Sequence, residues 1–450
     1  MRAMSALFTA CLAFPGVCAP ALAAEIFSPA VSPGGLPFWY LQRKDEPRAI
    51  VVGSFLDAFA LKYPDKIAAP VVGASIMNRG PKGVSAGEYS EQLKDTQARC
   101  GVSNDAMSAT FSVETKPEDL AGALDVCFRV VTDPALRDID FERLRKASKV
   151  SRERLETNRN GLASYVMRRL TWAAAPFSRW SEPEEIAKIT AADVDLWRRE
   201  IFARDNLVLV AVGSQEAATF GALIDHSFGA LPEMAAAASG VAPSPVYSGK
   251  TIVYELAGEQ TALVMEGPLA IETQEAQAAT IGNNVLGGGM DRRLGRAVRG
   301  EQGATYGISS GIGALAPGLR TLSIRSALAN DLAIAALARV REEFARWRKD
   351  GASEAEVAAS RGSLATSFDR SVESPGGKAF TLVQMLRTRR TAEDEAFYID
   401  RLRATDVAEV NRVLREKMPE RLTTVIVAPK AEGFAADCVI RAVSEIDRCR

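Results

Sequence analysis

The chain carries one sequence pattern twice, and this duplication limits its fold more than any other feature. Segment 38–53 has a counterpart in segment 252–267, where Ala262 matches Ala49 at an offset of 213 (262 minus 49). A repeat at one fixed period identifies a structural unit that occurs more than once. The chain is therefore expected to contain two related domains. Further matches follow in the same order: 110–113 with 321–324, Asp119 with Asp331, Asp193 with Asp406, and 207–212 with 422–427.

The pattern within each copy predicts the fold class. Strand segments rich in β-branched residues lie near the start, middle and end of each copy, and long amphipathic helical segments lie between them. This order is typical of an α+β protein, here two homologous tandem α/β sandwich domains. Segment 234–247 is small-residue and Pro-punctuated, as interdomain linkers are. We therefore expect an N-terminal domain over 25–233 and a C-terminal domain over 248–450.

The charge balance and the histidine count exclude several classes of protein. The chain has 55 Lys and Arg against 56 Asp and Glu, and no long basic run, so it lacks the electrostatic footprint of a nucleic-acid-binding protein. After residue 24, no stretch is apolar enough to span a bilayer. His226 is the single histidine, and its helical segment favours a structural or surface role. A histidine-rich metal site cannot be assembled from this chain.

Residues 1–24 have the features of an export signal. Arg2 stands near the start, an apolar stretch runs to Val17, and small residues lead up to Ala23. Pro15 and Gly16 argue against a buried first helix, because both residues break helices. We expect cleavage near Ala23 or Ala24 and a soluble, periplasmic mature protein.

Removal of the signal takes Cys11 and Cys18 away and leaves an even number of cysteines. An oxidising compartment allows four cysteines to form two disulfides, in any of three pairings. We expect pairing between sequence neighbours, and four buried thiols are the alternative. The expected pairs are Cys100 with Cys127 and Cys438 with Cys449.

One run in the second copy combines a glycine turn, an Arg-Leu pair and a later arginine and tyrosine. Gly287-Gly-Gly leads to Arg293-Leu, and Tyr306 follows Arg299 by seven positions. The run resembles the C-terminal signature of the insulinase/pitrilysin-like metallopeptidases, especially the short processing-peptidase-like members. Gly300 departs from the family pattern, which usually has Glu there. Segment 184–194 of the first copy also looks like the family, so the resemblance extends over nearly the whole mature chain.

The zinc motif of that family, H-x-x-E-H, is absent from the position where the resemblance places it. Catalytic zinc needs three protein ligands, and a nearby carboxylate takes a proton from the water. Val71 has no lone pair, Ala74 cannot act as a base and Ser75 is a poor ligand. Pro70 and Gly73 are expected to weaken the helix as well. We therefore expect no metal and no cofactor in this chain. Counting back from Arg79-Gly80, the five motif positions are Val71, Val72, Gly73, Ala74 and Ser75.

The resemblance implies work beside a second polypeptide. Active members of the family form a clam shell of four related domains, in which one half supplies zinc and the other an Arg/Tyr pair. This chain looks like the zinc-less half of such a clam-shell dimer, with an H-x-x-E-H homologue as its zinc-bearing partner. Arg299 and Tyr306 would then act in trans on peptide substrates. A guanidinium and a phenol can both donate hydrogen bonds to a carbonyl that is becoming an oxyanion.

Three alternatives stay open at this point. Arg299 and Tyr306 can simply pack or pair within their own domain. The fold can also serve a non-enzymatic assembly as a scaffold. Finally, Gly307-Ile-Ser-Ser-Gly311 matches the G-x-S-x-G pattern of serine hydrolases, with Ser309 as the nucleophile. That elbow needs a sharp strand-to-helix turn and a histidine later in the chain, whereas His226 comes earlier.

Overall fold

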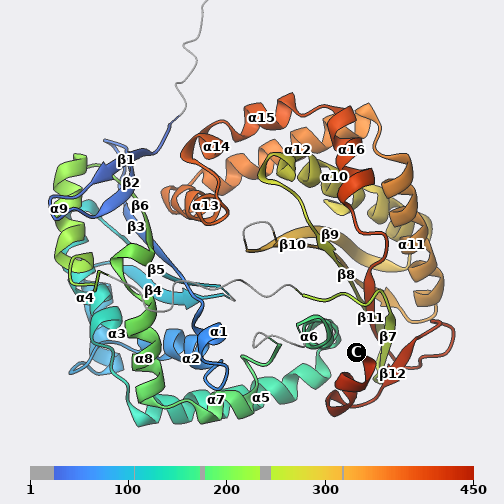
Figure 1. Cartoon of the computed structure of the whole chain (residues 1–450), viewed down its shortest axis with the longest axis horizontal. Coiled ribbons are helices and arrows are strands. Elements are labelled where there is room, and N and C mark those ends of the chain that lie inside the picture. Colours follow the sequence, from blue (N-terminus) through green and yellow to red (C-terminus); the bar gives the residue numbers. More distant parts are fainter. Residues whose placement is uncertain (1–24, 106, 173–177, 234–244, 317–318) are drawn as a thin grey trace, which may run out of the picture.

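The computed structural model describes residues 25–105, 107–172, 178–233, 245–316 and 319–450. The expected signal peptide, 1–24, lies outside the described residues, and so does most of the expected linker, 234–244. Two sheets dominate the structure, one in each half of the chain (Figure 1). In the described part of the chain, no helix has the length and apolar character needed to cross a bilayer.

The first sheet has six strands in the order β1-β2-β6-β3-β5-β4. The second has the order β12-β7-β11-β8-β10-β9, so five strands follow one another in the same arrangement as in the first sheet. The sixth strand differs in origin, because β1 comes from the start of the described chain and β12 from its end. In the first sheet the strands are β1 (Ser28–Val31), β2 (Pro37–Gln42), β6 (Leu207–Gly213), β3 (Ala49–Leu56), β5 (Ser108–Thr115) and β4 (Arg99–Asn104). In the second they are β12 (Cys438–Ile440), β7 (Thr251–Glu255), β11 (Thr423–Ala428), β8 (Gln260–Leu269), β10 (Leu319–Ala329) and β9 (Thr305–Ala316).

The strand register repeats along with the strand order. Val51 on β3 lies opposite Ala211 on β6, and Val264 on β8 lies opposite Val425 on β11. These pairs are related by 213 and 214 residues (264 minus 51, 425 minus 211), close to the offset found in the sequence. The expected α+β fold class, with two homologous tandem α/β sandwich domains, is therefore confirmed.

Helices cover both faces of each sheet. In the first half they are α1 (Phe59–Lys62), α2 (Ala69–Met77), α3 (Ala86–Asp95), α4 (Leu120–Thr132), α5 (Asp138–Thr157), α6 (Arg159–Thr171), α7 (Pro183–Lys188), α8 (Ala191–Ile201) and α9 (Ala217–Phe228). In the second half they are α10 (Ala276–Gly287), the π-helix η5 (Gly295–Glu301), α11 (Ala333–Asp350), α12 (Glu354–Val372), α13 (Pro375–Arg387), α14 (Ala392–Ala396), α15 (Tyr398–Ala404) and α16 (Val407–Lys417). Several begin with a capping box, such as Thr190 with Asp193 at α8, which satisfies two backbone N–H groups at the helix start.

One helix of each half packs against the sheet of the other half. Leu382 and Val383 on α13 pack with Ile50, Val52 and Val210 of the first sheet. In the same way, Leu162, Val166 and other apolar residues of α6 pack on the second sheet, against side chains of β7, β8 and β11. Figure 1 shows α13 beside β6 and β3, and α6 beneath the second sheet. The remaining face of each sheet is covered by helices of its own half.

Both halves contain one disulfide. Cys100 on β4 is joined to Cys127 on α4, and Cys438 on β12 is joined to Cys449 in the last 3₁₀ turn of the chain. These are the two local pairs expected from the sequence. Each disulfide ties the edge of its sheet to an adjacent helical segment.

Candidate functional site

The helix at the expected zinc-motif position, α2 (Ala69–Met77), is intact. Pro70 stands in its first turn, where the backbone has no hydrogen-bonded N–H to lose, so the expected weakening by this proline is wrong. Ala74 is buried, and Val71 and Ser75 are partly exposed. The Ser75 hydroxyl donates to the Val71 carbonyl oxygen at 2.8 Å. The two outer motif positions therefore satisfy each other within the helix.

Gly73, in the middle of the expected motif positions, forms a packing notch. A Cβ atom added to Gly73 would stand 2.4 Å from two ring carbons of Trp197, which comes from α8. The Trp197 indole N–H donates to Oδ2 of Asp57 at 2.8 Å, and the Phe59 N–H donates to Oδ1 at 3.0 Å. Burial raises the pKa of Asp57 to about 6. This buried carboxyl group orients an indole and is closed to solvent.

The donors around Ser75 do not fit a zinc ion. A cavity of about 220 Å³ adjoins this residue, and its single carboxylate is Asp140. Asp140 is already paired with Arg137 at 2.7 Å and lies 3.8 Å from Arg143. Across the described ranges, no three His, Cys, Asp or Glu side chains are grouped so that they could hold a metal ion.

Arg299 lies on η5, and its side chain is exposed to solvent. The same helix buries Ala297 and Val298 in the core of the second half. Its end is closed by the Gly303 and Ala304 N–H groups, which donate to the carbonyl oxygens of Arg299 and Val298, both at 3.0 Å. Within the described part of the chain, the Arg299 guanidinium has no hydrogen bond and no ion pair.

Tyr306 lies at the start of β9 and is 89% exposed. β9 is the edge strand of the second sheet, and a β-bulge interrupts its pairing with β10 at this point. The bulge is held by Thr305, whose hydroxyl donates to the Ala327 carbonyl at 2.6 Å and accepts from the Gly307 N–H at 3.0 Å. Bulges of this kind re-aim a side chain at the edge of a sheet. Only the turn at Gly303 separates η5 from β9, so the structure places Arg299 and Tyr306 on adjacent segments.

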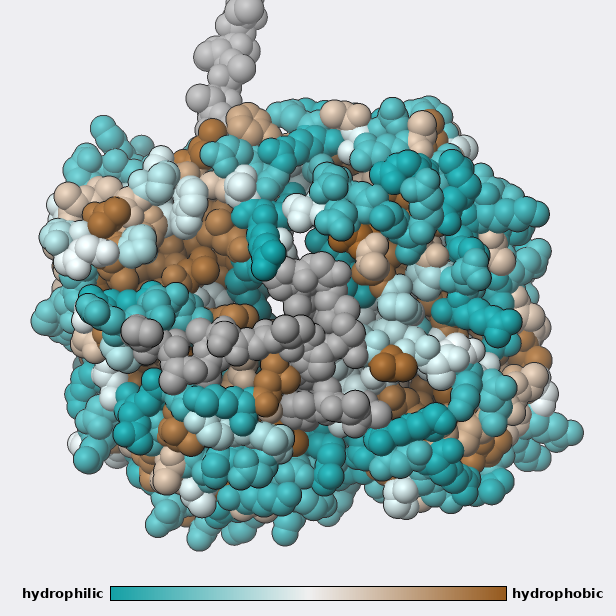
Figure 2. Space-filling model, viewed as in Figure 1, coloured by the Kyte–Doolittle hydropathy of each residue, from teal (hydrophilic) through white to brown (hydrophobic). Residues whose placement is uncertain are grey.

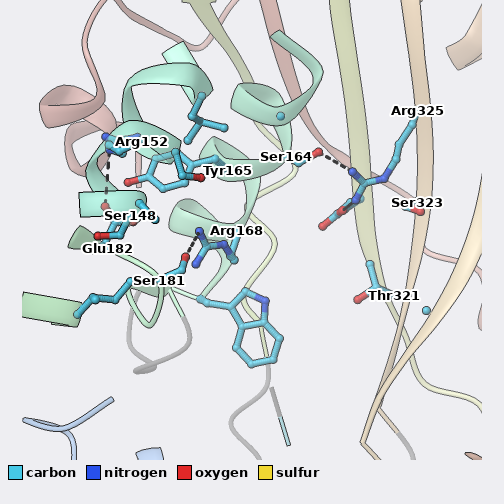
Figure 3. A pocket seen from close by; sticks show the side chains of 18 of the residues that line it. Ser148, Arg152, Ser164, Tyr165, Arg168, Ser181, Glu182, Thr321, Ser323 and Arg325 are labelled. Atoms are coloured by element: carbon cyan, nitrogen blue, oxygen red, sulfur yellow. Dashed lines mark hydrogen bonds and ion pairs between the residues drawn. The ribbon is translucent and has the colours of Figure 1, made fainter. Parts of the chain in front are cut away.

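A cavity of about 800 Å³ opens between the two halves and was not foreseen in the sequence. α5 and α6 line it on one side, and β8 and β10 line it on the other (Figure 3). Arg325 on β10 donates across this space to the Ser164 hydroxyl at 2.6 Å, and it also donates to Glu266 on the adjacent strand β8 at 2.7 Å. On the opposite wall, the Arg152 guanidinium stacks 4.6 Å from the centre of the Tyr165 ring. Neither Arg299 nor Tyr306 lines this cavity.

The surface of the molecule is also hollowed on one face. Figure 2 shows a hollow in the middle of one face, with hydrophobic side chains visible on the wall that the first half forms. The cavity of about 800 Å³ is lined by residues from seven separate chain segments, so no local sequence pattern could have found it. Its hydroxyl groups and its paired charges suit hydrogen bonding to a polar ligand.

The serine-hydrolase pattern and the single histidine lie apart from one another. Ser309 stands in β9, which continues through Gly311 to Ala316, so the required strand-to-helix turn is missing. His226 lies on α9 of the first half, where its exposed ring is 3.2 Å from Asp125. The structure brings no histidine to Ser309.

Part of the chain matches the sequence model of a known protein family. Residues 188–364 match the family model described as the Peptidase M16 inactive domain, a stretch that includes Arg299 and Tyr306 but not positions 71–75. No curated protein sequence matches the chain. The resemblance to the insulinase-like peptidases inferred from the sequence is thereby confirmed.

Solved structures share the fold at low sequence identity. A peptidase M16 inactive domain from Pseudomonas fluorescens is 19% identical, with a TM-score of 0.82, and the match covers 90% of this chain and 98% of that one. A protease from Helicobacter pylori is 16% identical, with a TM-score of 0.77 and coverages of 89% and 99%. The periplasmic protease PqqL from Escherichia coli is 16% identical, with a TM-score of 0.75, and the match covers 96% of this chain but 49% of that longer chain.

Proposed function

We propose that this chain, which carries the inactive-domain sequence of the M16 peptidases, is the zinc-less half of a two-part peptidase. The other half would be a homologous chain with an intact H-x-x-E-H motif and its zinc ion. This chain would bind peptide substrates and present Arg299 and Tyr306 to the zinc site of the partner. It would hold no metal or cofactor itself.

One observation carries the proposal: two hydrogen-bond donors, the Arg299 guanidinium and the Tyr306 hydroxyl, stand on adjacent segments and are both exposed to solvent. Arg299 is unpaired within the described residues, and Tyr306 is 89% exposed. Exposed tyrosines and unpaired arginines are enriched where a protein binds a partner or substrate. A peptide carbonyl that becomes an oxyanion would gain from both donors as its charge develops.

The free edge of β9 offers a second reason to expect peptides. An edge strand presents unpaired N–H and C=O groups that can pair with another extended chain. β9 spans Thr305–Ala316, and its outward side carries small residues, Gly307, Ser309 and Gly311 among them. An extended peptide beside this edge would lie close to Tyr306.

The architecture of one neighbour is compatible with a two-part enzyme. The match to this chain spans 49% of PqqL, so that protease contains about as much chain again. We infer that the present chain supplies one such half as a separate polypeptide. PqqL is described as periplasmic, and the two disulfides here suit an oxidising compartment, so we place this protein in the periplasm as well.

Reconstitution with the zinc-bearing homologue tests the proposal. Replacing Arg299 by Ala should lower kcat for peptide cleavage by about 100-fold, the size seen when one oxyanion donor is lost. Tyr306→Phe removes only the hydroxyl donor and should act in the same direction. Arg403→Ala is the matched control, because Arg403 is an exposed arginine of the same half whose one ion pair among the described residues is with Asp400, at 3.5 Å.

The outcome also separates the alternatives. Unchanged kcat and KM in both variants would refute the role of the pair and leave a scaffold function. Cleavage by the isolated chain that survives a chelator and is lost in Ser309→Ala would instead point to an independent hydrolase.

A further inference from the structure

The helix that carries Arg299 has an unusual form. η5 is a π-helix of seven residues, Gly295–Glu301. π-Turns are rare and occur mostly as short pieces, often at functional sites. A side chain on Gly295 would clash with the Met290 carbonyl oxygen at 2.3 Å, so the backbone approaches closely here. Two more glycines, Gly300 and Gly303, flank Arg299 on its C-terminal side and give this end little stiffness of its own.

The start of η5 is fixed by a partly buried ion pair between Arg293 and Glu356. Arg293 donates to Glu356 through two nitrogens, both at 2.7 Å, and to the Gly351 carbonyl at 2.8 Å. A two-pronged guanidinium–carboxylate contact fixes direction as well as distance. The proximity of Arg293 holds the pKa of Glu356 down to about 2, so the pair stays charged at any physiological pH.

The end of η5 is fixed by a second arginine, from α11. Arg339 donates to Glu301 at 2.9 Å, and Glu301 is the last residue of the π-helix. The same guanidinium lies 3.2 Å from Glu343, which is 6% exposed. Arg339 is thus anchored in the helix layer while it holds the C-terminal end of the segment that carries Arg299.

We propose that Arg339 and Glu301 are positioning residues that hold the Arg299 guanidinium in place for the substrate carbonyl. The inference rests on the proposed function. An exposed ion pair contributes little to global stability. Here the pair acts on a segment weakened by Gly300 and Gly303, so its effect falls on local order and not on the unfolding of the whole half.

Hydrogen exchange tests the positioning without any partner. The amide hydrogens of Gly303 and Ala304 report the closed end of η5, since they donate to Arg299 and Val298. Replacing Arg339 by Gln, or Glu301 by Gln, should speed exchange in a peptide that spans 297–304 by about tenfold, with the melting temperature almost unchanged. Arg346→Gln is the control, because Arg346 contacts the same Glu343 at 3.1 Å but, among the described residues, has no hydrogen bond or ion pair with η5.

Kinetics of the reconstituted peptidase complete the test. Arg339→Gln and Glu301→Gln should each lower kcat about five- to tenfold with KM nearly constant, and Arg346→Gln should match wild type. Added to Arg299→Ala, neither change should cost anything further, because the residue being positioned is gone. The reversed pair, Glu301→Arg with Arg339→Glu, should restore part of the rate.

The possible failures are distinct. If Arg299→Ala is slow but Arg339→Gln and Glu301→Gln are as fast as wild type, the positioning role is overturned and the proposed function stands. If Arg299→Ala itself has no effect, the proposed function fails. Faster exchange in Arg346→Gln as well would show that the variants disturb α11 as a whole, which also overturns the inference. Glu301 is 61% exposed, so Glu301→Gln keeps the test valid even if Arg339→Gln does not fold.

Discussion

The two halves use the same packing solution at equivalent helices, but they differ in the polar chemistry beside those helices. In the first half, Gly73 on α2 receives Trp197 from α8; in the second, Gly282 on α10 receives Leu414 from α16. Beside α2 the polar groups are buried, since the Trp197 indole N–H donates to the buried Asp57 carboxyl group. After α10 the chain forms η5 and presents Arg299 to solvent. A duplicated fold has thus kept its core packing while its polar side chains diverged.

The sharpest test of the comparison concerns the exchanged helices. Leu382 on α13 and Leu162 on α6 are both fully buried, and each packs on the sheet of the opposite half. Replacing either by Ala should cost about 2–5 kcal/mol of stability. Hydrogen exchange should show Leu382→Ala loosening β3 and β6, and Leu162→Ala loosening β8 and β11. Exposed Gln384 on α13 is the control position, and loosening confined to the half that holds the mutation would break the symmetry between the halves.

Removing each disulfide in turn should destabilise the two halves by different amounts. Cys100 and Cys127 are 27 residues apart, and Cys438 and Cys449 are 11 apart. Closure of the longer loop is worth about 3.6 kcal/mol and that of the shorter about 2.8 kcal/mol. Paired Cys→Ser variants should therefore lose more stability in the first half, as measured by the urea midpoint. Equal losses would show that loop length does not set the difference.

The folding stability of the first half should depend on pH through Asp57. Its pKa is raised from 3.8 to about 6 by burial, so the folded state holds the proton more tightly than the unfolded state. Stability from this group is present below pH 4 and is lost as the pH rises through 6, by about 3 kcal/mol in total. Asp57→Asn should remove this slope, so that wild type loses stability relative to the variant between pH 4 and 7. Parallel stability curves for the two proteins would contradict the assignment.

The smallest expected effect compares the two glycine notches. In Gly73→Ala the new methyl meets the Trp197 ring, which its hydrogen bond to Asp57 holds in place, and the cost should be about 2 kcal/mol. In Gly282→Ala the methyl meets the flexible end of Leu414 at 2.5 Å, which can rotate away. Alanine also favours the helix by about 1 kcal/mol, so this variant should stay near wild type. Equal melting temperatures in the two variants would show that the notches are alike.

The sequence predicted the duplication well because hydrophobic strand runs recur at a fixed offset, and that offset survives in the register of Val51 and Val264. The absence of zinc ligands at Val71, Ala74 and Ser75 stays a prediction, because it depends on where the resemblance places the motif in this chain. The roles of Arg299 and Tyr306 remain predictions, although both side chains prove to be exposed.

Features that depend on distant segments could not be predicted. Periodicity identifies α6 and α13 as amphipathic helices but does not say which sheet each one covers. Trp197 fills the notch at Gly73 from 124 positions away (197 minus 73), and a glycine inside a helix was the only local signal of it. The π-form of η5 leaves no periodic signature in seven residues. Pro70 misled for a simpler reason, because its effect depends on where the helix begins.

The packing of α13 from the second half on the sheet of the first half has a consequence for how the protein folds during synthesis. One face of the first sheet, with Ile50, Val52 and Val210, stays bare until the chain has been delivered as far as Arg387. Domains emerging from synthesis or export ordinarily fold one after another from the N-terminus. Here the N-terminal half cannot complete its core before the C-terminal half has been made. The nascent chain therefore exposes one apolar face of the first sheet. Until then, this apolar face is open to the non-native association that incompletely folded chains undergo.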